Sequence, residues 1–144
     1  MKMRTNFRNI VGYLLVGAFL AGCFVPVAYG VYKVYEDATQ IKVTVNVKET
    51  PEVVYAKALD VIKKKEQEGV TKITKEDDKK MEVTGTRKGV PASMKVTALK
   101  GGKSATLTVV EEKGKDPKEQ IEGLENYILQ TCSEIGLTCT KEKK

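Results

Sequence analysis

Histidine is absent from the 144 residues of this chain. Its absence removes the general base of Ser-His and Cys-His nucleophiles and the commonest protein ligand for metals. The three cysteines, Cys23, Cys132 and Cys139, do not form the cluster that a zinc site needs. We therefore predict that the chain is not an enzyme and that it uses no metal and no cofactor.

A strong excess of positive charge is also missing. The chain has 25 basic and 19 acidic residues, and three of the basic ones (Lys2, Arg4 and Arg8) stand at the N-terminus. The remainder holds 25 − 3 = 22 basic against 19 acidic residues, a surplus of three. Aromatic residues do not alternate with basic ones as they do in single-strand binders. A nucleic-acid partner is therefore not expected.

Two short motifs fall short of the sites that they resemble. Gly101–Ser104 ends like a phosphate-binding loop, but Thr97 stands where that loop needs a glycine. Glu76–Asp78 lacks the ligand spacing and the terminal Glu of a calcium loop. The first is rejected as a phosphate site, and the second is interpreted as a solvated turn.

The N-terminal segment has the form of a secretory signal. Its basic start is followed by an uncharged, mostly apolar stretch over residues 10–21, with small residues at its end. The stretch closes with Leu20, Ala21, Gly22 and Cys23.

This closing motif resembles the lipobox of bacterial lipoproteins. The resemblance implies that diacylglycerol alkylates the thiol of Cys23, that residues 1–22 are removed as a signal peptide, and that acyl chains hold the protein on a membrane. Two or more chains suffice for stable anchoring. Phe24 and Val25 follow the cysteine; in proteobacterial lipoproteins an Asp there retains the protein in the inner membrane. Its absence favours the outer membrane, with the domain facing the periplasm.

An uncleaved transmembrane helix is the alternative interpretation. No charge occurs between Arg8 and Lys33, so the uncharged run is long enough to cross a bilayer of about 30 Å. Pro26 and several glycines within the run disfavour a helix, although membrane helices tolerate both. Both interpretations place the rest of the chain beyond the inner membrane.

Cys132 and Cys139 remain as an even pair if Cys23 carries lipid. In an oxidising compartment such a pair is a disulfide candidate. A reduced pair, with Cys132 packed in the core, is the alternative.

Residues 23–40 are interpreted as a lipidated tether. Tyr29, Tyr32 and Tyr35 recur there at every third position, and they contact either the membrane interface or the underside of the domain. Residues 137–144 are interpreted as a basic C-terminal tail.

Hydrophobic periodicity predicts one α+β domain over residues 41–136. Residues 41–48 alternate as a strand with one buried face. Thr50 and Pro51 begin a helix that ends before Gly69, and Asp116 and Pro117 begin a second that ends at Gly136. Between the helices we expect four antiparallel strands, near residues 70–74, 81–88, 94–98 and 105–109. The order is therefore strand, helix, four antiparallel strands, helix, with both helices on one face of a single sheet.

This order, behind a lipobox and a tether rich in Gly and Tyr, resembles a group of small bacterial lipoproteins catalogued only as a domain of unknown function. There, as in Ile41–Gly69, a strand opens the domain and a helix ending in glycine follows. The resemblance implies a helix-grip or TBP-like module and transfers no catalytic residue.

The expected function is that of a membrane-anchored envelope lipoprotein. Its domain would be a non-enzymatic module that binds an envelope protein or scaffolds an assembly. The alternatives are a periplasmic binder of a small ligand or lipid, held between helices and sheet, and a single-pass membrane protein.

Overall fold

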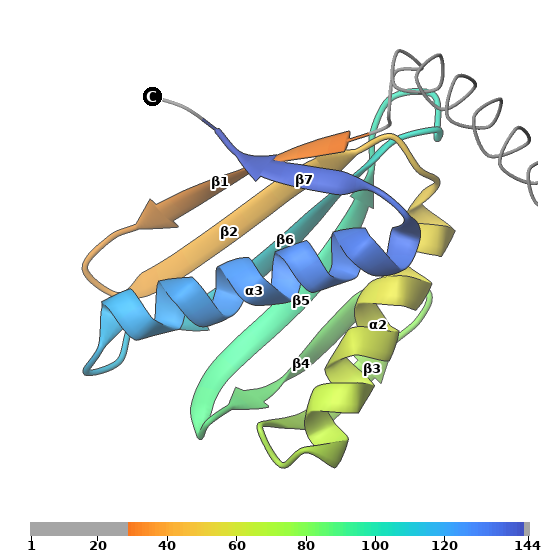
Figure 1. The fold of residues 1–144 in the computed structure, drawn as a ribbon. Coiled ribbons are helices and arrows are strands. Elements are labelled where there is room, and N and C mark those ends of the chain that lie inside the picture. The colour runs from red at the N-terminus through yellow and green to blue at the C-terminus, as the bar shows by residue number, and fades with distance from the viewer. Residues whose placement is uncertain (1–28, 143–144) are drawn as a thin grey trace, which may run out of the picture.

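The structure is a computed structural model, and it describes residues 29–142. Within them the elements are β1 (Tyr29–Glu36), β2 (Gln40–Val47), α2 (Pro51–Gln67), β3 (Thr71–Asp77), β4 (Glu82–Arg87), β5 (Val90–Ala98), β6 (Ala105–Glu112), α3 (Pro117–Ile135) and β7 (Thr138–Lys141). The strands form one sheet in the order β3-β4-β5-β6-β2-β1-β7. Both helices cover the same face of this sheet (Figure 1). The α+β class and the two-layer arrangement are as predicted.

Both helices begin with the caps that the sequence predicts. The side chain of Thr50 accepts a hydrogen bond from the amide of Val53 at 3.4 Å, and Asp116 accepts one from the amide of Glu119 at 3.1 Å. A proline follows each cap at the first helical position, where its missing N–H has no cost. Gly136 ends α3 with a φ of 91°, which glycine adopts without strain.

The core lies between the sheet and the two helices. The inward residues of β2 and β6 alternate strictly with exposed or half-buried ones, and they are apolar except for Glu111 in β6. The helices close over these strands with one apolar stripe each. The most deeply buried side chains are Ile41, Val43, Val45, Val54, Val61, Leu107, Leu124 and Ile128.

The predicted tether over residues 23–40 is wrong between Tyr29 and Glu36, because these residues form β1. Strand β1 pairs antiparallel with β2 from Val31 opposite Asn46 to Glu36 opposite Ile41. The strand satisfies the backbone groups on one side of β2, which would otherwise be an exposed sheet edge. Of the tyrosines, Tyr32 is buried under the helices, while Tyr35 is 46% exposed.

The predicted tail over residues 137–144 is wrong for Thr138–Lys141, which form β7. This strand pairs parallel with β1, from Tyr29 opposite Thr138 to Tyr32 opposite Lys141. The left-handed turn at Gly136 returns the chain to the sheet, and Cys139 is buried there. The globular part of the described chain therefore extends beyond the predicted domain of residues 41–136 at both ends.

A smaller correction concerns the turn before β5. The gap between the strands predicted near residues 81–88 and 94–98 is shorter than expected, because the turn lies at Lys88 and Gly89, which both have positive φ. Strand β5 already begins at Val90. Pro91 lies within the strand, opposite Thr86 of β4.

Candidate functional site

The lipobox residues Leu20, Ala21, Gly22 and Cys23 lie outside the described residues. Strand β1 begins six residues after Cys23. Six residues of extended chain reach about 20 Å. Among the helices of residues 29–142, none combines the length and the apolar character that a membrane span requires.

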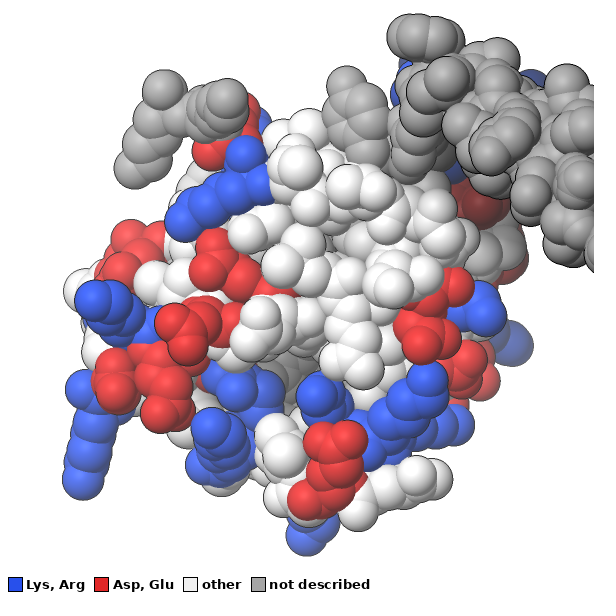
Figure 2. Space-filling model, in the orientation of Figure 1, with Lys and Arg blue, Asp and Glu red and all other residues white. Residues whose placement is uncertain are grey.

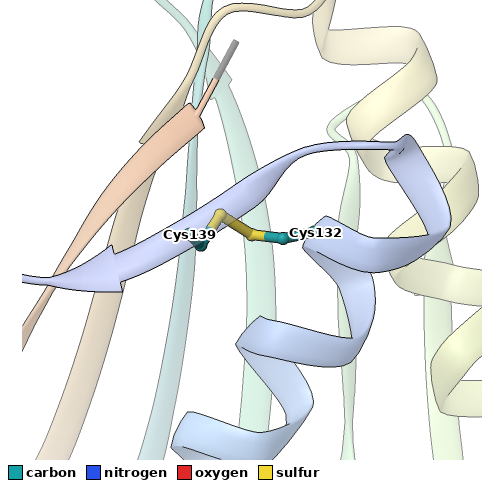
Figure 3. The surroundings of a disulfide bond; sticks show 2 residues. All are labelled: Cys132 and Cys139. Carbon is teal, nitrogen blue, oxygen red and sulfur yellow. A yellow bond between two sulfur atoms is a disulfide. The ribbon is translucent and has the colours of Figure 1, made fainter. Parts of the chain in front are cut away.

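Cys132 and Cys139 form a disulfide between the last turn of α3 and β7 (Figure 3). Their Cα atoms are 6.1 Å apart, within the usual range for a bridge. Gly30 of β1 packs against it: a Cβ on this glycine would lie 2.9 Å from the sulfur of Cys139. The bridge therefore joins the helix to the sheet edge, and any side chain at position 30 would have to displace the sulfur of Cys139 and the side chains of Val45 and Val47.

A groove opens on the helix-bearing face, in the angle between the second half of α2 and the middle of α3. Its volume is about 280 Å³. Figure 2 shows this face hollowed between the helices, with basic side chains on either side of the hollow. Most of the wall is apolar and comes from both helices and from β5 and β6; it includes Ile62, Val70, Met94, Val109, Leu124 and Tyr127.

Small residues occupy neighbouring inward positions of β4 and β5. The inward positions of β4 and β5 include Gly85 and Ala92, which face each other across the two strands. Neither residue is fully buried, although both lie on the helix side of the sheet. A Cβ at Gly85 would collide with the backbone of Lys72 in β3, so this position requires glycine.

A buried ion pair forms one end of the groove. Arg87 at the end of β4 donates to both carboxylate oxygens of Glu111 in β6, from Nε at 2.7 Å and from Nη2 at 3.0 Å. Glu111 is 1% exposed. This bidentate arrangement is the strongest form of carboxylate recognition by an arginine.

Gln120 of α3 completes the network around Glu111. Its side-chain amide donates to Oε1 of Glu111 at 2.7 Å and to the carbonyl of Glu112 at 2.8 Å. Its side-chain oxygen accepts from the amide of Gly114 at 2.6 Å. The carboxylate is thus held by three donated hydrogen bonds from two side chains, which compensate for its removal from water.

Gly123 makes room for the guanidinium on the inner side of α3. A Cβ at this position would lie 2.6 Å from Nη1 of Arg87 and 3.0 Å from its Cζ. Glycine within a helix costs about 1 kcal/mol relative to alanine. Glycine at position 123 therefore lowers the stability of the helix but allows the arginine side chain to lie close to the helix backbone.

The opening of the groove is positively charged. Lys65 of α2 and Lys88 of the β4–β5 turn line it together with Arg87, while Glu111 is the only acidic residue in the lining. Because Arg87 neutralises Glu111, no acidic group of the lining is left to neutralise the two lysines. Each lysine also has an exposed ion pair on the surface, with Glu68 at 3.8 Å and Glu119 at 3.4 Å.

Burial raises the pKa of three tyrosines above its ordinary value. Tyr127, a wall of the groove, donates its hydroxyl proton to the carbonyl of Ala58 at 3.0 Å. Tyr55 donates to Asp78 at 2.6 Å, and Tyr32 to Glu125 at 3.2 Å; in both pairs the carboxylate raises the pKa further. These hydroxyls are structural donors at neutral pH.

Within residues 29–142 no three Cys, Asp or Glu side chains gather as metal ligands. The solvated turn predicted at Glu76–Asp78 is wrong for Glu76 and Asp77, which end β3, while Asp78 begins the turn. Lys63 lies 3.7 Å from Glu76, and Asp78 accepts from Tyr55.

The groove residues were not identified from the sequence. One signal was available, because Glu111 continues the inward register of Ala105, Leu107 and Val109 along β6. A carboxylate at a position that should be apolar indicates a buried partner. Arg87 could not be named as that partner without knowing that β4 lies two strands away from β6.

Comparison of the chain with protein-family models, with curated proteins and with solved structures finds no match. What the domain does must therefore be inferred from its own residues.

Proposed function

We propose that the chain is a membrane-anchored envelope lipoprotein whose domain is a non-enzymatic module for binding a protein partner. The proposal rests on the contrast between two cysteines that form a disulfide and a third that stands apart from them in the sequence. Cys132 and Cys139 are bridged within the domain, as is usual in an oxidising compartment. Cys23 stands apart from them at the end of an apolar segment that resembles a lipobox.

The short connection to β1 supports a position close to the membrane. With lipid on Cys23, the start of β1 stays within about 20 Å of the bilayer surface. The turns that adjoin this end of the sheet, after β2 and between β5 and β6, then face the membrane. The turn between β1 and β2, at Asp37–Thr39, points away from it.

The uncovered face of the sheet is the surface proposed for the partner. Outward residues of β1 leave two apolar side chains accessible there, Val31 at 38% and Tyr35 at 46% exposure. Lys42 lies over the ring of Tyr35, with its ammonium 5.1 Å from the ring centre. Exposed tyrosines next to polar neighbours are enriched at protein interfaces.

A site-specific crosslink tests the partner surface. A photo-reactive residue at position 35 is expected to crosslink one envelope protein reproducibly in intact cells, and the same residue at Lys79 in the β3–β4 turn serves as control. Tyr35→Ser is expected to abolish co-purification of that protein without changing the unfolding midpoint. Equal crosslinking from both positions, or none from position 35, contradicts this part of the proposal.

The anchor is tested separately by Cys23→Ser. The variant is expected to accumulate as an unprocessed, unacylated precursor, because the thiol is the only group that diacylglycerol can alkylate there. Processing at the wild-type rate contradicts the lipoprotein proposal. A wild-type chain that stays full-length and inserted in the membrane would favour the single-pass alternative.

A further inference from the structure

We infer that the groove between α2 and α3 binds a small amphiphilic anion: one carboxylate on a single unbranched apolar chain. The inference goes beyond the proposed protein-binding function, because it concerns the opposite face of the sheet, and it is independent of how the chain is anchored. Three observations carry it, namely the size of the groove, the composition of its wall and the charge at its opening.

The size sets an upper limit on the ligand. A cavity of about 150 Å³ accommodates benzene, so 280 Å³ accommodates roughly twice as many non-hydrogen atoms, about twelve. A medium-chain fatty acid has this size. A phospholipid with two long chains is several times larger and does not fit.

The wall suits an unbranched apolar chain. Met94 and Val109 form the floor on the sheet, and Ile62, Leu124 and Tyr127 form the sides. The hydroxyl of Tyr127 is already engaged by the carbonyl of Ala58, so the ring presents its apolar part. Removing such a chain from water favours binding in proportion to the apolar surface that the groove covers.

The charge at the opening selects an anion. Lys65 and Lys88 lie at the edge of the groove, and Nη1 of Arg87 makes no hydrogen bond within the described part of the chain. Glu111 is fully engaged by Arg87 and Gln120 and does not repel a second carboxylate as a free one would. The ion pairs of the two lysines with Glu68 and Glu119 are exposed, and a ligand can compete with such weak pairs.

Methionine methyl groups provide the readout in the intact protein. Met94 lies on the floor of the groove, whereas Met81, in the β3–β4 turn, is outside its lining. The full chain is labelled with ¹³C at its methionine methyl groups, placed in phosphatidylcholine nanodiscs and titrated with octanoate. Octanol at equal free concentration is the uncharged control ligand.

The expected result is a saturable shift of the Met94 methyl resonance with octanoate, while that of Met81 stays in place. The double variant Lys65→Glu/Lys88→Asn is expected to weaken octanoate binding roughly tenfold and to leave octanol binding unchanged. Asparagine is chosen at position 88 because it tolerates the positive φ of this residue. Lys103→Glu/Lys100→Asn makes the same charge change in the β5–β6 turn and is expected to bind octanoate as the wild type does.

Either of two results overturns the inference. The first is a Met94 methyl that octanoate does not shift saturably. The second is a lack of selectivity for the anion at this site: octanol shifts the Met94 resonance as octanoate does, or both double variants weaken octanoate binding to the same extent. If octanoate does not shift the Met94 resonance but Cys23 is processed and acylated, the inference about the groove is wrong while the proposed lipid anchor is supported. The two failures are therefore distinguishable.

Discussion

Glu111 is the residue on which the architecture of the groove depends most. Its carboxylate is buried, and Arg87 and Gln120 donate all of its hydrogen bonds. A buried ion pair adds little net stability, because removing two charges from water offsets their attraction. Removing only one partner is different, since it leaves an uncompensated charge in the core.

We predict that Arg87→Gln lowers the free energy of unfolding by about 3–5 kcal/mol. The double variant Arg87→Met/Glu111→Leu is expected to lie much closer to the wild type, because it removes both charges together. Urea unfolding followed by circular dichroism measures both. Lys88→Gln, which breaks the exposed pair with Glu119, is the control and should change stability by about 1 kcal/mol at most. An equal loss in the single and double variants would contradict a buried charge pair.

Thr131 permits a stabilising substitution. Its hydroxyl oxygen is buried in α3 and has no hydrogen-bond partner among the described residues. An unsatisfied buried hydroxyl costs about 1–3 kcal/mol, and valine has the same shape without the polar atom. Thr131→Val should therefore raise the free energy of unfolding by about 1 kcal/mol. A loss of stability in urea would show that the hydroxyl finds a partner in solution.

At the scale of elements, strands β2 to β6 and both helices could be predicted, while β1 and β7, the two neighbouring strands at one end of the sheet, could not. Strand β2 has an unbroken alternation, and the helices carry caps at both predicted starts. Strand β1 has apolar residues on both faces, Tyr32 inward and Val31 and Tyr35 outward, so its period-two signal is weak. Strand β7 has four residues and pairs with a segment over a hundred positions away.

The disulfide holds this last edge strand. Its loop is short, with a sequence separation of seven, so the chain-entropy model gives a contribution of about 2 kcal/mol. Cys132→Ser/Cys139→Ser should lower the free energy of unfolding by that amount and increase amide exchange in β7 before β2. Uniform exchange across the sheet would contradict a local role for the bridge.

At the scale of the whole molecule, the buried tyrosines make stability dependent on alkaline pH. Burial raises the pKa of Tyr127 and of Tyr55 above the value of about 10 in the unfolded chain. A raised folded-state pKa stabilises the protein below the unfolded value, and this contribution is lost as the pH rises toward the folded value. The folded state must therefore lose stability above roughly pH 10.

Urea midpoints measured between roughly pH 8 and pH 11 test this dependence. Tyr127→Phe should flatten the alkaline decline, although it is less stable at neutral pH because the hydrogen bond to Ala58 is lost. A wild-type midpoint that stays constant across this range would contradict the burial of ionisable hydroxyls.

At the same scale, the proposal that the molecule is an envelope lipoprotein requires both a lipid anchor at Cys23 and the disulfide between Cys132 and Cys139, and one intact-mass measurement tests both. The protein is isolated from membranes and weighed before and after reduction. The account predicts a chain that begins at Cys23, carries the added mass of a diacylglyceryl group, and gains two hydrogens on reduction. An unmodified chain of 144 residues that gains none would contradict it.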